Sequence, residues 1–330
     1  MTNEKVSVIM SCYKEKKEWL NLSIESILGQ TYQNIEFLII VDDPDNAELK
    51  NIIYRYAMKD NRIRVCENEK NMGLVYSLNK GLEMSTGKYI ARMDADDISE
   101  NRRIEEELNH LKKYNLDLVG SDIVAIDENS DIMPGVAAQM PVSNQYIKYI
   151  LRYKSCLMHP TWLGKKEIFE TMSGYREINY CEDYDFLLRA VLSGARLGNI
   201  PEPLLKYRYN FLGISRQNKA EQRCITYFLG RNRKVIDVLS TATINSFPVS
   251  TEGKKEIREM KEYFLISKIA LQNKMDGDYR KLLKTCIKIL RTKYGRRNAY
   301  IIFITKFLIK LDRREILNKE VQATMVKEIY

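Results

Sequence analysis

Apolar and polar positions form two alternating patterns along the first 125 residues. Short runs of apolar and β-branched residues predict buried strands, and segments in which apolar residues recur every three or four positions predict helices. The expected strands are Val6–Met10, Ile35–Val41, Ile63–Cys66, Tyr89–Met93 and Leu116–Val124, and the expected helices are Trp19–Gly29, Glu48–Met58, Gly73–Met84 and Arg102–Tyr114. This alternation predicts an α/β fold with a doubly wound, mostly parallel sheet of Rossmann type. Such sheets bind ligands beyond the carboxyl ends of their strands.

The pattern changes at about residue 211, where helical periodicity replaces the alternation. The expected helices of this part are Lys219–Leu239, Lys254–Gln272, Tyr279–Thr292 and Ala299–Leu311. We interpret Ser240–Gly253, which contains Pro248, as a linker. The sequence therefore predicts an α/β region followed by a basic α-helical C-terminal region.

Charge separates the same two parts. The 330 residues carry a formal net charge of +9. Residues 1–210 hold 27 basic and 32 acidic side chains, whereas residues 211–330 hold 26 basic and 12 acidic ones. An excess of positive charge in one part favours a negatively charged partner, either nucleic acid or an anionic membrane surface.

The first residues and the cysteines favour a cytoplasmic protein. Residues 1–5 lead into the first apolar run without the leader of a secreted protein. The six cysteines are far apart in sequence, which disfavours a zinc ribbon or a disulfide framework. The apolar stretch Ala299–Leu311 contains two lysines and is shorter than the roughly 20 apolar residues of a membrane span.

Carboxylates follow the expected strand Tyr89–Met93. Asp94, Asp96 and Asp97 repel one another unless a cation lies between them, and Mg²⁺ and Mn²⁺ bind such oxygens together with phosphate oxygens. The alternative is a solvated acidic turn or helix cap. Because ligands bind at the carboxyl ends of strands, the sequence favours a metal–nucleotide site here.

Two further acidic groups have open interpretations. Asp42 and Asp43 follow Ile35–Val41, where they either accept hydrogen bonds from a base or ribose or form an ordinary Asp-Pro turn. Glu182–Asp185 precedes an amphipathic stretch and either caps a helix or supplies a general base. No G-x-G-x-x-G follows the first strand, which argues against a dinucleotide-binding fold.

In this order and at these spacings, the segments resemble glycosyltransferase family 2, whose members are inverting enzymes with the GT-A fold. The resemblance covers about residues 5–215 and rests on Val6–Tyr13, Ser26–Tyr32, Val41–Asp43, Asn71–Gly73, Gly87–Asp97, His159–Thr161 and Glu182–Asp185. Ser11, Lys14 and the segment after Asp43 depart from the commoner family residues, so the identity of the nucleotide base stays open. The resemblance implies a catalytic domain at residues 1–215, with nucleotide-sugar binding in 1–125 and the acceptor side in 126–215. Residues 216–330 form the basic helical region.

The resemblance also implies roles for single residues. Asp42 contacts the nucleotide base, with Asp43 beside it. Asp94 faces the nucleotide, and Asp96 holds Mn²⁺ or Mg²⁺ against the diphosphate. Asp183 is the catalytic base.

Four other residues are weaker candidates for the same site. His159 is expected beside the acceptor, with Glu182 near it, and the alternative for the histidine is a packed structural role. Arg208 and Arg216 are expected to bind the donor diphosphate from a mobile loop after the core, and the alternative for each is a solvated surface side chain.

These observations predict a metal-dependent glycosyltransferase that takes a nucleotide-sugar, expected to be UDP-linked, and acts on a glycan or polyprenyl-linked acceptor in surface polysaccharide synthesis. Two alternatives remain: a sugar-1-phosphate nucleotidyltransferase, or a non-enzymatic membrane or nucleic-acid adaptor. Acidic strand ends disfavour nucleic acid. The apolar stretch within residues 294–314, bracketed by arginines, either contacts an anionic membrane from the cytoplasmic side or packs on the catalytic domain or a second subunit in a homo-oligomer.

Overall fold

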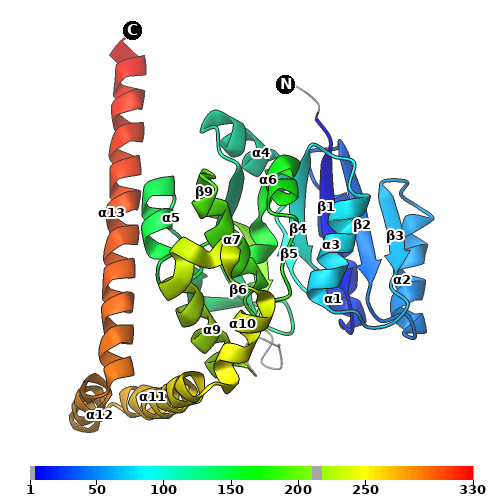
Figure 1. Ribbon diagram of the computed structural model, residues 1–330. Coiled ribbons are helices and arrows are strands. Elements are labelled where there is room, and N and C mark those ends of the chain that lie inside the picture. Colours follow the sequence, from blue (N-terminus) through cyan, green and yellow to red (C-terminus); the bar gives the residue numbers. More distant parts are fainter. Residues whose placement is uncertain (1–3, 210–217, 330) are drawn as a thin grey trace. The chain divides into compact units, whose positions relative to one another are not determined.

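The computed structural model describes residues 4–209 and 218–329, without the side chains of residues 135–138, 293 and 318–329 (Figure 1). The chain divides into two compact units. The first unit comprises Met1–Leu151, Ser155–Glu177 and Glu182–Phe211, and the second, here called the helical unit, comprises Arg152–Lys154, Ile178–Cys181 and Leu212–Tyr330.

The first unit follows the alternation read from the sequence. Its strands are β1 (Val6–Cys12), β2 (Ile35–Val41), β3 (Ile63–Glu67), β4 (Tyr89–Asp94), β5 (Ile98–Ser99), β6 (Leu118–Ile126), β7 (Ile132–Ala138), β8 (Leu163–Lys165) and β9 (Leu197–Arg208). Its helices are α1 (Lys17–Leu28), α2 (Ala47–Ala57), α3 (Leu74–Met84), α4 (Arg103–Lys113), α5 (Asn144–Ile150), the 3₁₀ turn η1 (His159–Thr161), α6 (Lys166–Thr171) and α7 (Glu182–Leu192).

One sheet runs through this unit in the order β3-β2-β1-β4-β8-β6-β9-β5, with β7 paired to β6. Strands β3, β2, β1 and β4 are parallel, as the alternation predicts. The short strand β8 then pairs antiparallel to both β4 and β6, while β9 runs parallel to β6. The expected α/β fold with a mostly parallel sheet is confirmed, and the antiparallel β8 joins its two parallel parts.

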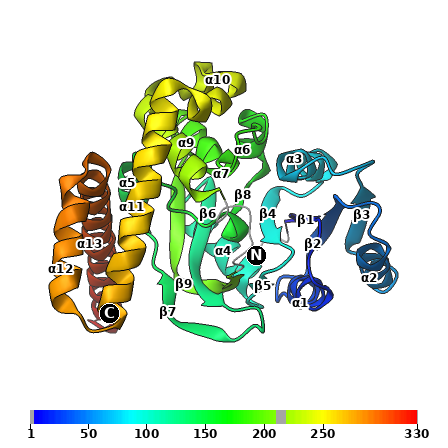
Figure 2. The ribbon, with the colours of Figure 1, turned by 90° about the horizontal axis from the view of Figure 1, so that it is seen from below.

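Helices cover both faces of the parallel part of the sheet. Helices α1 and α2 lie on one face of β1–β3, and α3 lies on the other (Figure 2). Every residue of β2 is consequently buried, which explains its continuous apolar sequence. The parallel register brings the carboxyl ends of β1, β2 and β4 to the same edge, since Ser11 lies opposite both Ile40 and Asp94.

The helices described in the helical unit are α9 (Lys219–Asn232), η2 (Arg233–Val238), α10 (Thr241–Ser246), η3 (Phe247–Val249), α11 (Thr251–Met275), α12 (Tyr279–Arg291) and α13 (Lys293–Ile329). Helices α11, α12 and α13 lie side by side (Figures 1 and 2). A small core joins the unit, built around Cys224, Phe247, Met260 and Tyr294. Among the helices described, none combines the length and the apolar character needed to cross a bilayer.

One expectation for this region was wrong, and one expected helix is longer than predicted. Ser240–Gly253 is not an irregular linker, because it forms α10, η3 and the start of α11. Serine side chains cap both helices: Ser240 accepts the N–H of Thr243, and Ser250 accepts the N–H of Gly253. Pro248 stands in the first turn of η3, where its missing N–H is tolerated. The expected helix Ala299–Leu311 is only part of the longer α13.

Candidate active site

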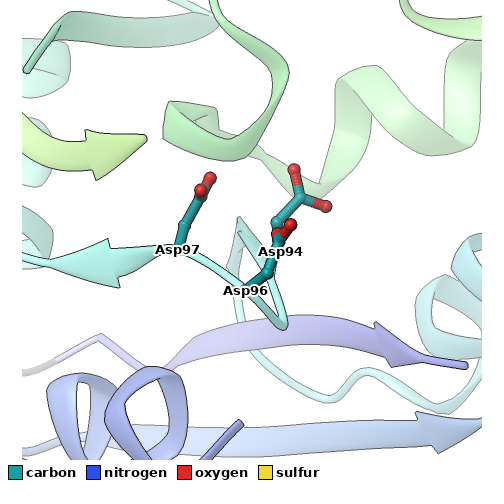
Figure 3. A group of neighbouring side chains, drawn as sticks. All are labelled: Asp94, Asp96 and Asp97. Carbon is teal, nitrogen blue, oxygen red and sulfur yellow. The ribbon is translucent and has the colours of Figure 1, made fainter. Parts of the chain in front are cut away.

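The end of β4 and the turn after it carry three carboxylates. Asp94 ends β4, Asp96 lies in the turn and Asp97 directly precedes β5. The three side chains leave the turn toward the same side (Figure 3). One oxygen of each lies within 4.8 Å of the others. The structure thus brings together all three aspartates of the predicted metal–nucleotide site, including Asp94 and Asp96, which were expected to hold the metal.

Burial makes this cluster electrostatically unfavourable without a cation. Burial and the charge of Asp94 raise the pKa of Asp96 to about 7. Burial and the charges of Asp96 and Asp94 also raise the pKa of Asp97 well above its usual range. Oδ1 of Asp97 accepts the backbone N–H of Arg208 at 2.7 Å, but its buried Oδ2 has no hydrogen-bond partner among the described residues. An unpartnered carboxylate oxygen beside two further carboxylates fits a hard divalent cation.

The end of β2 uses its carboxylate differently. Asp42 is only 3% exposed. Its Oδ1 accepts Nδ2 of Asn68 at 2.6 Å and the N–H of Met72 at 2.8 Å, and its Oδ2 accepts the N–H of Gly73 at 2.9 Å. Gly73 has φ +88°, a backbone conformation that favours glycine, directly before α3. Asp42 therefore holds the β3–α3 loop against the sheet edge, while its neighbour Asp43 is half-buried.

The first turn of α7 carries Glu182, Asp183 and Asp185, which have separate surroundings. Asp185 is fully buried and accepts Nε of Arg189 at 2.9 Å and Nε of Arg176 at 3.0 Å. Arg189 in turn donates to the carbonyls of Met172 and Gly174. This network fixes the start of α7 to the chain before it and leaves Glu182 and Asp183 as the acids without such a network.

Burial dominates the ionisation of both remaining acids. It raises the pKa of Asp183 to about 6, although hydrogen bonds from the backbone N–H groups at the helix start lower that value. Burial and the charge of Asp183 raise the pKa of Glu182 to about 8, and Asp94 contributes in the same direction. The strand-end cluster and the start of α7 are therefore close enough to influence each other.

Arg92 is a buried cation of this site. It lies within β4, 4% exposed, and its Nη2 contacts Oδ1 of Asp94 at 2.5 Å. Its Nε and Nη1 have no hydrogen-bond partner within the described residues. The charge of Arg92 lowers the pKa of Asp183 and Glu182 as well as that of Asp96. Sequence reasoning missed this residue, although a single charged residue inside a buried strand is a signal that could have identified it.

His159 lies in η1 within an aromatic group. Its Nε2 lies 3.0 Å from the hydroxyl of Tyr175, and its ring centroid lies 4.5 Å from that of Trp162. Its Nδ1 lies 3.9 Å from a carboxylate oxygen of Glu182. Burial, and then the charge of Arg92, lower the pKa of His159 well below its usual value. The ring is therefore neutral at physiological pH and is fixed by packing.

Arg208 lies in a different setting from the expected mobile loop. It ends β9 and is 2% exposed. Its guanidinium donates to the carbonyls of Asp96 and Asp127, each at 2.7 Å, and to the hydroxyl of Ser130 at 2.9 Å. It also lies over the ring of Trp19. Arg208 thus fastens the acidic turn to the β6–β7 hairpin, and Arg216 lies outside the described residues.

Glu15 is a further acid that sequence reasoning missed. It follows β1 at the same sheet edge, and burial raises its pKa to about 7, with additional contributions from the charges of Asp96 and Asp94. Its Oε2 accepts the backbone N–H of Tyr13 at 2.8 Å. Its place after a buried parallel strand was the available signal, because carboxyl ends of such strands meet at one edge.

Comparison with known proteins decides the family. Residues 7–173 match the family described as "Glycosyl transferase family 2". The chain belongs to this family. It is 35% identical over 204 residues to an uncharacterised glycosyltransferase of Methanocaldococcus jannaschii, covering 62% of this chain and 70% of that protein. It is 33% identical over 226 residues to the O-antigen biosynthesis glycosyltransferase WbnJ of Escherichia coli, covering 68% and 87%.

Structural similarity supports the same fold for this family 2 glycosyltransferase. A mannosyltransferase from Pyrobaculum calidifontis, solved with GDP-Man and Mn²⁺, superposes with a TM-score of 0.56 at 15% identity. The superposition covers 95% of this chain and 87% of the mannosyltransferase. The expected GT-A fold is confirmed, and family membership removes the adaptor and nucleotidyltransferase alternatives.

Proposed function

We propose that this glycosyltransferase moves a sugar from a nucleotide-sugar to a hydroxyl of a glycan or lipid-linked glycan in polysaccharide synthesis, with inversion at the anomeric carbon and with a divalent cation. The relationship to an O-antigen biosynthesis enzyme supports the polysaccharide pathway. A UDP-linked donor remains our expectation, and the GDP-Man bound by the structural neighbour is the competing donor type. The carboxylate cluster with the unpartnered Asp97 oxygen is the observation that carries the proposal.

Asp94, Asp96 and Asp97 would hold Mn²⁺ or Mg²⁺. A bound ion would neutralise the negative charge that develops on the departing nucleoside diphosphate. The support for this assignment is the donor set: each of the three carboxylates has an oxygen within 4.8 Å of the others, and Oδ2 of Asp97 has no hydrogen-bond partner among the described residues. Arg208 holds the turn that carries them through hydrogen bonds to Asp96 and Asp97. We propose this positioning role for Arg208 in place of direct contact with the diphosphate.

Asp183 is the proposed general base. The acceptor hydroxyl must lose its proton as its oxygen attacks the anomeric carbon, and a carboxylate on the acceptor side takes that proton onto one of its oxygens. A pKa of about 6 keeps Asp183 ionised at neutral pH yet basic enough to accept the proton. Glu182 and the neutral ring of His159 would line the acceptor side beside it.

Arg92 is proposed to favour the ionised form of these neighbouring acids. Its buried charge favours the ionised form of Asp183 and forms an ion pair with Asp94. Asp42 is proposed to act on the nucleotide by shaping the loop through Met72 and Gly73, with Asp43 beside it facing the base.

The remaining parts of the proposal concern organisation. We propose that residues 1–215 act as the catalytic domain, with donor binding in 1–125 and the acceptor side in 126–215. A cytoplasmic location agrees with the six cysteines, all of which lie in the described residues as free thiols. Membrane contact through residues 294–314 and association into a homo-oligomer remain parts of the proposal.

A panel of nucleotide-sugars tests this function. The full chain is incubated with each donor in the presence of Mn²⁺, and both slow donor hydrolysis and thermal stabilisation are recorded. We expect one donor to stabilise the protein and to be hydrolysed slowly, and we expect EDTA to abolish hydrolysis. A tenfold excess of donor over its dissociation constant gives about 1.4 kcal/mol of stabilisation, which is measurable as a shift in Tm.

The matched control is the exposed Asp45 near the same edge of the sheet. Asp45→Asn should respond to donor and Mn²⁺ like the wild type, whereas Asp96→Asn should lose the response to Mn²⁺. Equal responses of the two variants to Mn²⁺ would rule out the cluster as the metal site. A flat response of the wild type to every donor would contradict the proposed function as a whole.

A further inference from the structure

Helix α12 of the helical unit separates apolar and basic residues onto two sides. At 3.6 residues per turn, Tyr279, Leu283, Ile287 and Leu290 fall on one side. Arg280, Lys281, Lys284, Lys288 and Arg291 fall on the other, and the helix contains no acidic residue. Such a distribution is typical of helices that lie in the interface of a membrane.

The apolar side of α12 is only partly used for packing. Helix α12 contacts α11 and α13, yet none of its residues, all of which are described, is buried. Tyr279 is 72% exposed, Leu283 63%, Leu290 48% and Ile287 44%. Within the part of the chain that the structure describes, an apolar strip therefore stays largely exposed along the helix.

The basic residues border this strip and are exposed as well. Arg280, Lys284 and Arg291 are all exposed, on the side of α12 next to Leu283 and Ile287. The adjoining helix α11 differs, since it mixes Lys and Arg with four glutamates. Apart from Asp278 at the N-cap, which pairs with Lys281, the charged side chains of α12 are therefore all basic. On α11, four glutamates offset most of the six basic residues.

This combination selects among possible occupants. A second copy bound through the same face would place the five positive charges of each helix near those of its partner, which is unfavourable. Nucleic acid would satisfy the charges but would leave the apolar strip in contact with phosphates and water. An anionic bilayer offers acyl chains to the strip and negative headgroups to the basic border.

We propose that α12 binds an anionic lipid bilayer, with Tyr279, Leu283, Ile287 and Leu290 inserted at the level of the headgroups and with its basic side chains on the lipid phosphates. The proposal does not rest on the donor, the metal or the catalytic base. It adds α12 to the membrane contact proposed for residues 294–314.

Co-sedimentation of the full chain with vesicles tests this assignment. Vesicles of phosphatidylcholine alone are compared with vesicles that contain about one third phosphatidylglycerol. We expect binding to the anionic vesicles only, with strong weakening as salt rises from about 0.1 M to about 0.5 M. Equal binding to both vesicle types, or none to either, would overturn the proposal.

Variants locate the contact. Each basic side chain near a membrane contributes about a fivefold change in partition, so Arg280→Gln/Lys284→Gln/Arg291→Gln should weaken binding roughly a hundredfold. Leu283→Ser/Leu290→Ser should weaken it at least tenfold through the apolar strip. The matched control is Lys254→Gln/Lys261→Gln/Lys268→Gln on α11, which removes the same charge from exposed positions. It should retain most of the binding.

Three results would overturn the assignment. An α11 control as weak as the α12 triple variant would mean that net charge alone drives binding. Loss of binding in Phe303→Ser/Phe307→Ser, with the α12 variants unaffected, would place the contact on α13. A concentration-dependent dimer that Leu283→Ser/Leu290→Ser dissociates, without vesicle binding by the wild type, would make a second copy the occupant. Circular dichroism of each variant verifies that the helices remain folded.

Discussion

Asp183 and Asp185 lie two residues apart on α7, yet the protein surrounds them differently. Asp185 lies between Arg176 and Arg189, which neutralise its charge and tie the helix to the preceding chain. Asp183 has no such ion pair within the described residues: burial raises its pKa to about 6, although backbone N–H groups and the more remote charge of Arg92 lower it. The carboxylate of Asp185 therefore stabilises the fold, whereas that of Asp183 remains available to exchange a proton.

The ends of β2 and β4 repeat this contrast. Asp42 accepts three hydrogen bonds from its own chain. Asp96 and Asp97 instead lie in a crowded cluster in which one buried oxygen has no partner among the described residues. A carboxylate that its own chain satisfies supports structure, while one left unsatisfied indicates a ligand or a reaction.

The largest expected effect is the loss of activity when Asp183 is substituted. Asp183→Asn keeps the size of the side chain but cannot accept the proton, so turnover should fall about 10²–10⁴-fold. Donor binding, measured by calorimetry, and the free energy of unfolding should change little. A variant that retains most of its turnover would remove Asp183 from the role of base.

The second largest expected effect is the loss of stability when Asp185 is substituted. Asp185→Asn leaves the half-buried Arg176 and the buried Arg189 without a full counter-charge, which should lower the free energy of unfolding by about 3–5 kcal/mol. Urea denaturation measures this change. If Asp183→Asn proved as destabilising as Asp185→Asn, the contrast between the two acids would be wrong.

Asp96→Asn should affect activity without loss of stability. Removing one charge from the cluster relieves repulsion, so the free energy of unfolding should stay level or rise by about 1 kcal/mol. Metal-dependent turnover should fall about 10²–10³-fold, by analogy with the loss of one charge-stabilising group at a transition state. Donor hydrolysis across a series of Mn²⁺ concentrations measures the turnover. A drop in the free energy of unfolding would contradict the inference that the carboxylates of the cluster repel one another.

Asp42→Asn should instead lower stability and leave Mn²⁺ binding intact. An amide cannot accept from Asn68, Met72 and Gly73 at once, because its Nδ2 meets a donor, and the free energy of unfolding should fall by about 2–3 kcal/mol. Binding of Mn²⁺, followed by its effect on Tm, should persist. Undiminished stability would show that the loop does not depend on this carboxylate.

The smallest effect concerns pH. As the proposed general base, Asp183 has to be ionised, so turnover should be constant above its pKa of about 6 and fall up to tenfold per pH unit below it. The charged groups that shift this pKa are Arg92 on β4, which lowers it, and Asp185 on α7, which raises it. A pH–rate profile at saturating donor and acceptor measures the limb. If the residual activity of Asp183→Asn still falls below about pH 6 in the same way, the titrating group is not Asp183.

Local patterns in the sequence were sufficient for much of the fold. Continuous apolar runs such as Ile35–Val41 predict strands buried on both faces, and the helices between them follow from their periodicity. The parallel strands β1–β4 were therefore predictable, and so was the acidic edge at which Asp94 and Asp96 lie. The short β8 and the helical stretch at residues 240–253 were not, because their few residues are stabilised mainly by distant packing.

The sequence by itself determined the family and the positions of the acidic groups, because strand alternation and motif order are encoded in neighbouring residues. Only the tertiary structure decided which acids are satisfied. The donors to Asp42 lie 26 to 31 residues away, and Arg208 contacts a turn 112 residues before it. Whether a carboxylate has donors or an unpaired oxygen depends on such long-range contacts, which local patterns do not specify. The roles of Arg92 and Arg208 became visible for the same reason.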